Sequence, residues 1–166
     1  MASIILGYRV DSCYGCLTEP GGWSFDIFSK GTVRFKTYLM NGEATSSTKD
    51  TLPKSVIDNI YLTLQNWRAD ISRLPKETNN HSCDGSYHSF KFLGSKITSL
   101  NISRHEDVGN VEYEKYYDEE YIQTLQTENT VLQIFESACK FLSPFGLQVE
   151  IEPSFYCCWN GHTGCL

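Results

Sequence analysis

Polar and apolar residues alternate in four short segments of this chain, and a turn joins the segments into two pairs. Ser29-Lys30-Gly31 supplies the turn in the first pair, and Gly94-Ser95 supplies it in the second. The four segments are residues 23–28, 32–40, 88–92 and 96–104. A period of two residues predicts β-strands, and strands joined by short turns pair antiparallel. The chain is therefore expected to form two β-hairpins in a mostly antiparallel sheet.

Two longer stretches carry apolar residues at helical spacing. The first begins after Pro53, which suits the first turn of a helix, and it ends before Pro75. Its apolar stripe consists of Val56, Ile57, Ile60, Tyr61, Leu64, Trp67 and Ile71. The second stripe consists of Leu125, Leu132, Phe135, Cys139 and Leu142. An interruption of this second helix is allowed near the polar pair Glu128-Asn129, and Pro144 ends it.

Residues 4–10 and 147–157 are predicted to be strands, and the polar stretch 41–51 is predicted to be a loop. The order of elements is then strand, hairpin, helix, hairpin, helix, strand. This order predicts an α+β fold whose mostly antiparallel sheet has about six strands, made from the two hairpins plus the N- and C-terminal strands. Two helices are expected on one face of that sheet. Residues 1–166 have the length of one domain and contain no linker or repeat, so we expect a single α+β domain.

The net charge narrows the class of partner. The formal charge is −6 at pH 7, and the 14 Lys and Arg residues are scattered along the sequence, so direct nucleic-acid binding is not expected. A basic protein partner suits this charge better.

The first ten residues have no cationic region followed by a long apolar run, and no later run approaches the length of a membrane span. We therefore expect a cytoplasmic protein that does not bind membranes.

Residues 105–121, called the acidic tyrosine segment below, hold seven carboxylates and four tyrosines. Tyrosine is a rigid, amphipathic anchor at protein interfaces, and a dense set of carboxylates steers a basic partner. The residues expected to bind that partner are Glu112, Tyr113, Glu114, Tyr116, Tyr117, Asp118 and Tyr121. A purely structural alternative stays open, because Asp118, Glu119 and Glu120 stand where a helix is predicted to begin and carboxylates favour that position.

Two doublets of metal-ligating residues stand near opposite ends of the chain, Cys13-Tyr-Gly-Cys16 and His162-Thr-Gly-Cys165. Ligands two residues apart can chelate zinc from one tight turn, so the doublets predict a closed, structural zinc site that joins the ends. Cys158 is a substitute for His162 in that site. Unpaired thiols are one alternative, and a disulfide between the ends is another that needs an oxidising compartment. A zinc-stapled structural or adaptor domain is thus one alternative function.

A third function would be a cysteine-dependent enzyme. Cys83 stands beside His81 and Asp84, with His88 a few residues further on, and an imidazole can lower the pKa of a thiol and activate it. A non-catalytic alternative is that these residues only form the turn, because polar loops that lead into hairpins are rich in such residues. The sequence contains no phosphate-binding glycine loop, nucleophile elbow, zinc-protease motif or dinucleotide fingerprint.

In its general character, as a small acidic α+β chain without a catalytic motif, the sequence is similar to bacterial toxin-immunity proteins and to phage-encoded inhibitors of defence systems. The likeness rests on no motif and transfers no residue. It implies a non-catalytic protein that inhibits or neutralises its partner by binding it.

Overall fold

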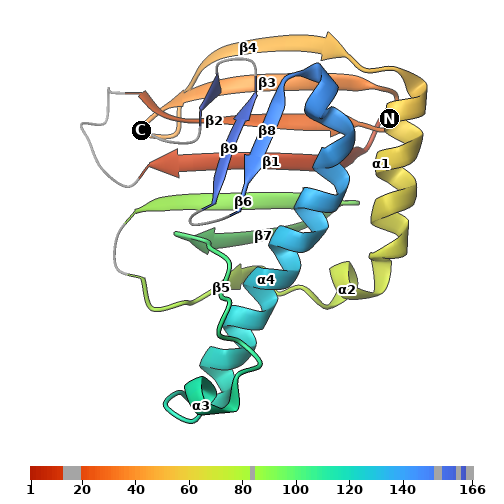
Figure 1. Cartoon of the computed structure of the whole chain (residues 1–166). Helices are drawn as coiled ribbons and strands as arrows, with labels where there is room; N and C mark the ends of the chain where they lie inside the picture. Colours follow the sequence, from red (N-terminus) through yellow and green to blue (C-terminus); the bar gives the residue numbers. More distant parts are fainter. Residues whose placement is uncertain (13–19, 83–84, 152–154, 160–161, 164–166) are drawn as a thin grey trace.

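The computed structural model describes residues 1–12, 20–82, 85–151, 155–159 and 162–163. Its main feature is a seven-stranded sheet with the order β4-β3-β2-β1-β6-β7-β5 (Figure 1). The strands are β1 (Ile4–Ser12), β2 (Pro20–Phe28), β3 (Thr32–Leu39), β4 (Ala44–Thr51), β5 (Glu77–Thr78), β6 (Ser86–Phe92) and β7 (Ser95–Leu100). Every neighbouring pair is antiparallel except β5 and β7, which are parallel.

The long helices cover one face of this sheet (Figure 1). The helices are α1 (Lys54–Asn66), α2 (Arg68–Arg73), α3 (Val111–Glu114), α4 (Glu119–Cys139) and the 3-10 helix η1 (Lys140–Phe145). A small sheet of β8 (Leu147–Glu150), β9 (Tyr156–Trp159) and β10 (His162–Thr163) packs on the same face. The ring of Trp159 in β9 meets Phe25 and Phe35 edge to face, with 4.9 Å between ring centroids in both pairs. The expected α+β fold, with helices on one face of a mostly antiparallel sheet, is confirmed.

Aromatic rings fill the core between the sheet and α4. The ring of Tyr8 in β1 lies 5.4 Å from Phe90 and 5.5 Å from Phe135 of α4, centroid to centroid. His88 is buried in the same cluster, and its Nδ1 lies 2.8 Å from the Tyr8 hydroxyl. The inward-facing residues expected in the strands, such as Phe25 and Phe90, are therefore core residues.

The structure corrects the prediction that residues 41–51 form a loop, because β4 occupies most of that stretch. All eight residues of β4 are exposed, so the sequence of this strand has no alternating apolar face from which it could be predicted. The strand is held by backbone pairing with β3, in which Arg34 lies opposite Lys49 and Lys36 lies opposite Ser47. Antiparallel pairing satisfies the backbone groups of β4 on its inner edge without side-chain burial.

Three boundaries and the continuity of one helix also differ from the sequence-based expectation. The predicted strand 147–157 is two strands, β8 and β9, that form a hairpin with each other. The first predicted helix breaks at Trp67, where ψ is 6° and α1 gives way to α2. Strand β7 ends at Leu100 because Asn101 adopts a left-handed conformation with φ of 50°. No interruption occurs at Glu128, since α4 runs through it.

No helix in the described part of the chain combines the length and the apolar character that crossing a bilayer requires.

Candidate protein-binding site

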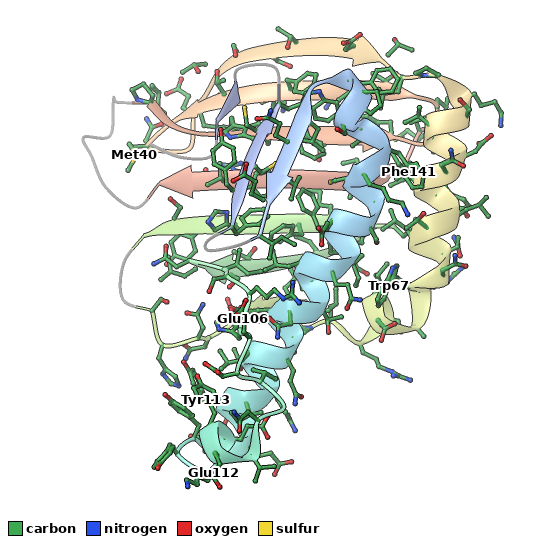
Figure 2. All side chains as sticks on the ribbon, in the orientation of Figure 1. Met40, Trp67, Glu106, Glu112, Tyr113 and Phe141 are labelled. Carbon is green, nitrogen blue, oxygen red and sulfur yellow. The ribbon has the colours of Figure 1, made fainter. Side chains whose placement is uncertain are left out.

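The acidic tyrosine segment forms an end of the molecule that extends away from the sheet. The chain leaves β7, forms the short helix α3 and returns as the first half of α4, and this part lies beyond β5 (Figure 1). Glu112 and Tyr113 lie at its far tip (Figure 2). We call α3 and the first turns of α4 the projecting end. Side chains there can meet a partner without interference from the sheet.

Three hydrogen bonds fix the start of the segment to α4. The Nε2 atom of His105 lies 2.7 Å from Oε2 of Glu128. The backbone N–H of His105 donates to Oδ1 of Asn129 at 2.8 Å, and the Asn129 amide donates back to the His105 carbonyl at 3.0 Å. The reciprocal pair of bonds between His105 and Asn129 has the distances of good hydrogen bonds. The segment is thus anchored where it leaves the core.

Glu128 is fully buried, and its carboxylate joins three further side chains. Its Oε1 atom accepts hydrogen bonds from Ser99 of β7 at 2.5 Å and from Thr78 of β5 at 2.9 Å. The Asn80 amide donates to the same oxygen at 2.9 Å. A buried carboxylate is tolerated when several donors satisfy it. Glu128 therefore ties the projecting end to the edge of the sheet.

The sequence analysis missed this role and placed a possible helix interruption at Glu128. A signal was available, because Glu128 follows Leu125 by three residues and precedes Leu132 by four. That spacing puts it on the apolar stripe of the helix. A charged residue at a core position indicates a buried polar network.

Short-range hydrogen bonds shape the projecting end. Asn110 begins α3, and its side chain accepts from the N–H of Glu112 at 3.0 Å. Asp118 begins α4 and accepts from the N–H of Tyr121 at 2.7 Å. The expected structural role of Asp118 at a helix start is therefore confirmed. Glu112 forms an ion pair with Lys115 on the same surface.

Aromatic rings form a row along one side of this end. The ring of Tyr117 lies 4.9 Å from Tyr113 and 5.1 Å from Tyr121, and Tyr121 lies 5.1 Å from the ring of His81. We call these four residues the aromatic row. Partial desolvation and a hydrogen bond to Tyr117 raise the pKa of Tyr113. The rings are tilted by 39–42° to one another, and such contacts restrict the rings before any partner arrives.

Exposure differs among the tyrosines. Tyr116 stands outside the aromatic row with 76 % of its surface exposed, and Tyr117 is 44 % exposed. Tyr113 and Tyr121 are half-buried, as is Glu114, whose carboxylate accepts from the N–H of Gly109 at 2.6 Å. Of the seven residues expected to bind a partner, the structure brings all seven together on the projecting end, with Tyr116 and Tyr117 the most accessible tyrosines.

A hollow of about 560 Å³ opens beside the aromatic row, between α4 and the stretch around β5. Its charged lining residues among the described part of the chain are the carboxylates of Glu77, Asp118 and Glu120. Tyr121 and His81 of the aromatic row form part of its wall. The sequence did not indicate Glu77, because it stands far from the acidic tyrosine segment along the chain.

The proposed cysteine enzyme cannot be assembled from described residues, since Cys83 lies outside them. His81 is exposed and belongs to the aromatic row. His88 is buried, and burial lowers its pKa to about 4, although the charge of Glu128 acts in the opposite direction. The two histidines therefore have different surroundings, and His88 has the hydrogen bond and packing of a core residue.

The zinc prediction also falls largely outside the described residues, which exclude Cys13, Cys16 and Cys165. The backbone of His162 pairs with Trp159, and Cys158 is half-buried in β9. No three His, Cys, Asp or Glu side chains of the described ranges are grouped as a metal site, and the zinc site stays a prediction. Burial raises the pKa of the thiols of Cys139 and Cys157 well above the ordinary value, as expected for inert core cysteines.

No known protein-family model matches the chain, and no curated protein matches it.

Proposed function

We propose that this chain is a non-catalytic interaction protein, of the inhibitor or immunity type, and that the projecting end binds a basic partner protein. The observation that carries the proposal is the combination of fixed and exposed tyrosines at the tip. The rings of the aromatic row are already in tilted contact with one another, and Tyr116 exposes 76 % of its surface beside them. Ordered tyrosines lose little conformational entropy on binding, which is why they are frequent in binding hot spots.

The charge of the projecting end supports a basic partner. Glu119 and Glu120 are exposed in the first turn of α4, and Glu112 is exposed on α3. Glu77 and Asp118 add two carboxylates at the hollow beside Tyr121. A surface of this sign accelerates the encounter with a cationic protein and weakens binding of acidic ones. A lysine or arginine of the partner would find both carboxylates and an aromatic face at the hollow.

The anchoring of the projecting end also supports the proposal. Glu128, His105 and Asn129 hold the segment to α4 through buried or half-buried groups. A solvated surface loop does not require such anchoring. The network fixes the base of the segment to α4, and such preorganisation lowers the entropic cost of binding.

The proposal is tested by isolating the partner and measuring its affinity. The tagged protein captures partners from its native cell, and the captured protein is purified and titrated by calorimetry against the wild type and two sets of variants. Tyr116→Ala and Tyr117→Ala should each weaken binding by more than about 1 kcal/mol if the tip is the hot spot. Glu119→Gln with Glu120→Gln should weaken binding mainly at low salt, because exposed charges are screened.

Two matched controls separate the tip from general effects. Tyr87 is 48 % exposed on β6, so Tyr87→Ala removes a comparable ring from the sheet and should leave the affinity unchanged. Glu43→Gln removes an exposed charge from the turn before β4 and should also have no effect. A captured partner that is acidic, or one whose affinity falls equally in the control and tip variants, would contradict the proposal.

A further inference from the structure

A second hollow, of about 640 Å³, lies at the end of the seven-stranded sheet where β1 begins. The first residues of the chain, the turn between β6 and β7, and the last turns of α1 surround it. Its charged lining residues among those the structure describes are Arg68, Lys91 and Lys96, and no carboxylate lines it. A hollow whose described charged lining is entirely cationic is unexpected in a chain with a net charge of −6.

Two of these cations lie where their charges repel each other. Lys91 and Lys96 lie directly opposite each other on β6 and β7, and like charges at that position repel. Lys91 is partly compensated, because its Nζ lies 2.8 Å from Oδ1 of Asp26. That ion pair crosses Gly7, where a Cβ would come within 2.6 Å of the Asp26 oxygen. A residue with a Cβ at position 7 would clash with the Asp26 carboxylate, so the Lys91–Asp26 ion pair across β1 requires a glycine there.

Neither of the other two cations forms an ion pair with a described residue. Arg68 donates to the Gln65 side chain at 3.3 Å, which is a neutral partner. Lys96 is exposed and forms no ion pair with any residue in the described part of the chain. Two uncompensated charges and one partly compensated charge thus face the same hollow. Cations from separate elements that line one hollow can bind a dianionic group such as phosphate.

The rest of the wall is apolar or aromatic. Ile4, Phe28 and Leu93 are half-buried at the hollow, and Tyr61 of α1 is 45 % exposed there. The volume falls in the range of about 300–1,000 Å³ that is typical of small-molecule sites. Such a wall provides contact for a ring, while the cations provide contact for its anionic group. A bare inorganic ion would leave the apolar wall uncovered.

We propose that this hollow binds a small phosphorylated molecule with a ring-shaped body. The phosphate lies between Arg68 and Lys96, and the ring packs against Tyr61. The site lies apart from the projecting end and does not rest on the proposed protein partner. A second basic surface supplies the contrast, because Arg34, Lys36 and Lys49 line a separate hollow at β3 and β4 whose described lining contains no aromatic residue. The aromatic ring of Phe28 lies 5.0 Å from the Arg34 guanidinium, and it does not line that hollow.

The test is a calorimetric titration of the full chain with phenyl phosphate, AMP and inorganic phosphate at about 0.15 M ionic strength, where weak surface attraction is screened. We expect saturable binding of phenyl phosphate or AMP with a dissociation constant near or below about 1 mM. Lys96→Gln and Arg68→Gln should each weaken it about five- to tenfold. Tyr61→Ala should weaken binding of phenyl phosphate and leave inorganic phosphate unaffected. Lys49→Gln, the matched charge control, should change nothing.

Three results would overturn the inference. The first is the absence of saturable binding by both ring-bearing phosphates in a wild-type protein shown to be folded by circular dichroism. The second is an equal loss of affinity in Lys49→Gln and Lys96→Gln, which would show a general charge effect. The third is binding of inorganic phosphate as tight as that of phenyl phosphate, which would remove the role of the ring.

Discussion

Glu128 stands on the buried face of α4, and its carboxylate meets side chains from β5, β7 and the stretch that follows each of them. Four side chains contact the two oxygen atoms of a carboxylate that itself has no exposed surface. Removing the carboxylate leaves the donors among them without an acceptor. The free-energy cost of a buried donor left unsatisfied generally exceeds the net contribution of the hydrogen bond that it made. This residue therefore affects both the stability of the chain and the placement of the projecting end.

We predict that Glu128→Ala lowers the free energy of unfolding by about 3–5 kcal/mol. Glu128→Gln should cost less, because its amide keeps one accepting oxygen, but its NH₂ group faces a site built from donors. Urea unfolding followed by circular dichroism measures both. Glu136→Gln, an exposed change on the same helix, is the control and should be neutral. An unchanged stability of Glu128→Gln would mean that the network contributes little.

His88 gives a prediction for pH. Burial lowers its pKa in the folded protein to about 4, below the ordinary value of 6.5. The unfolded chain therefore binds a proton at a higher pH than the folded chain does, so stability present above pH 6.5 is lost as the pH falls toward 4. At about 1.4 kcal/mol for each pKa unit, the loss reaches on the order of 3 kcal/mol.

Urea unfolding at a series of pH values between 7 and 4 measures this loss. His88→Gln should flatten the pH dependence over that interval, because the variant has no group that titrates at this position. Equal slopes in wild type and His88→Gln would contradict the assignment.

At the level of elements, the first turn of α4 depends on one side chain. Asp118 accepts a hydrogen bond from the N–H of Tyr121, and Tyr121 in turn packs between Tyr117 and His81. Asp118→Ala should therefore lower stability by about 1 kcal/mol and loosen the aromatic row. Asp118→Asn keeps the cap and removes the charge, so it should restore stability. Hydrogen exchange at the Tyr121 amide measures the local effect, and a protection factor unaffected by Asp118→Ala would show that the cap is dispensable.

The elements that were predicted well share a visible apolar pattern. Trp23, Phe25 and Ile27 alternate along β2, and Leu132 and Phe135 follow the helical stripe of α4, so the sequence alone indicates these two elements. Strand β4 has no buried residue, and it exists because β3 offers a free edge. That pairing is a tertiary effect which local patterns cannot report. The same holds for the β8–β9 hairpin, whose Trp159 packs on strands far away in sequence.

The residues of the candidate site also fall into those that the sequence indicated and those that only the fold brings together. The tyrosines and carboxylates of residues 105–121 are contiguous, so composition revealed them. The anchoring by Ser99 and Thr78 required knowledge of which strands lie beside α4. The basic hollow was hidden for a related reason, because Lys91 and Lys96 are brought together with Arg68 by a hairpin and a helix end. Cations that look scattered along the sequence converge in the fold.

At the scale of the whole molecule, the two sheets and the helices share one hydrophobic core. The cluster of buried residues includes Leu6 and Phe25 from the large sheet, Phe135 from α4, and Cys157 and Trp159 from β9. If the small sheet packed only loosely on the surface, its buried residues would form a hydrophobic cluster separate from the main one. The shared cluster implies that the small sheet unfolds together with the rest of the chain.

Trp159 tests this cooperativity. Its ring is 2 % exposed, it meets Phe25 and Phe35 edge to face, and its Nε1 donates to the Phe145 carbonyl at 2.8 Å. Trp159→Ala should lower the stability of the whole chain by about 3–5 kcal/mol, because it leaves a cavity in the common core. Trp159→Phe should cost less, since it keeps a ring and loses the hydrogen bond.

The remaining tryptophans supply the measurement. Trp23 is buried in the large sheet and Trp67 lies between α1 and α2, so their fluorescence in Trp159→Ala reports unfolding away from the site of the change. A shared core requires that this fluorescence change at a lower urea concentration than in Trp159→Phe, and that far-UV circular dichroism follow the same curve. If the fluorescence midpoint stays the same as in Trp159→Phe while part of the dichroism signal is lost early, the small sheet is an independent unit and the idea of one cooperative core is wrong.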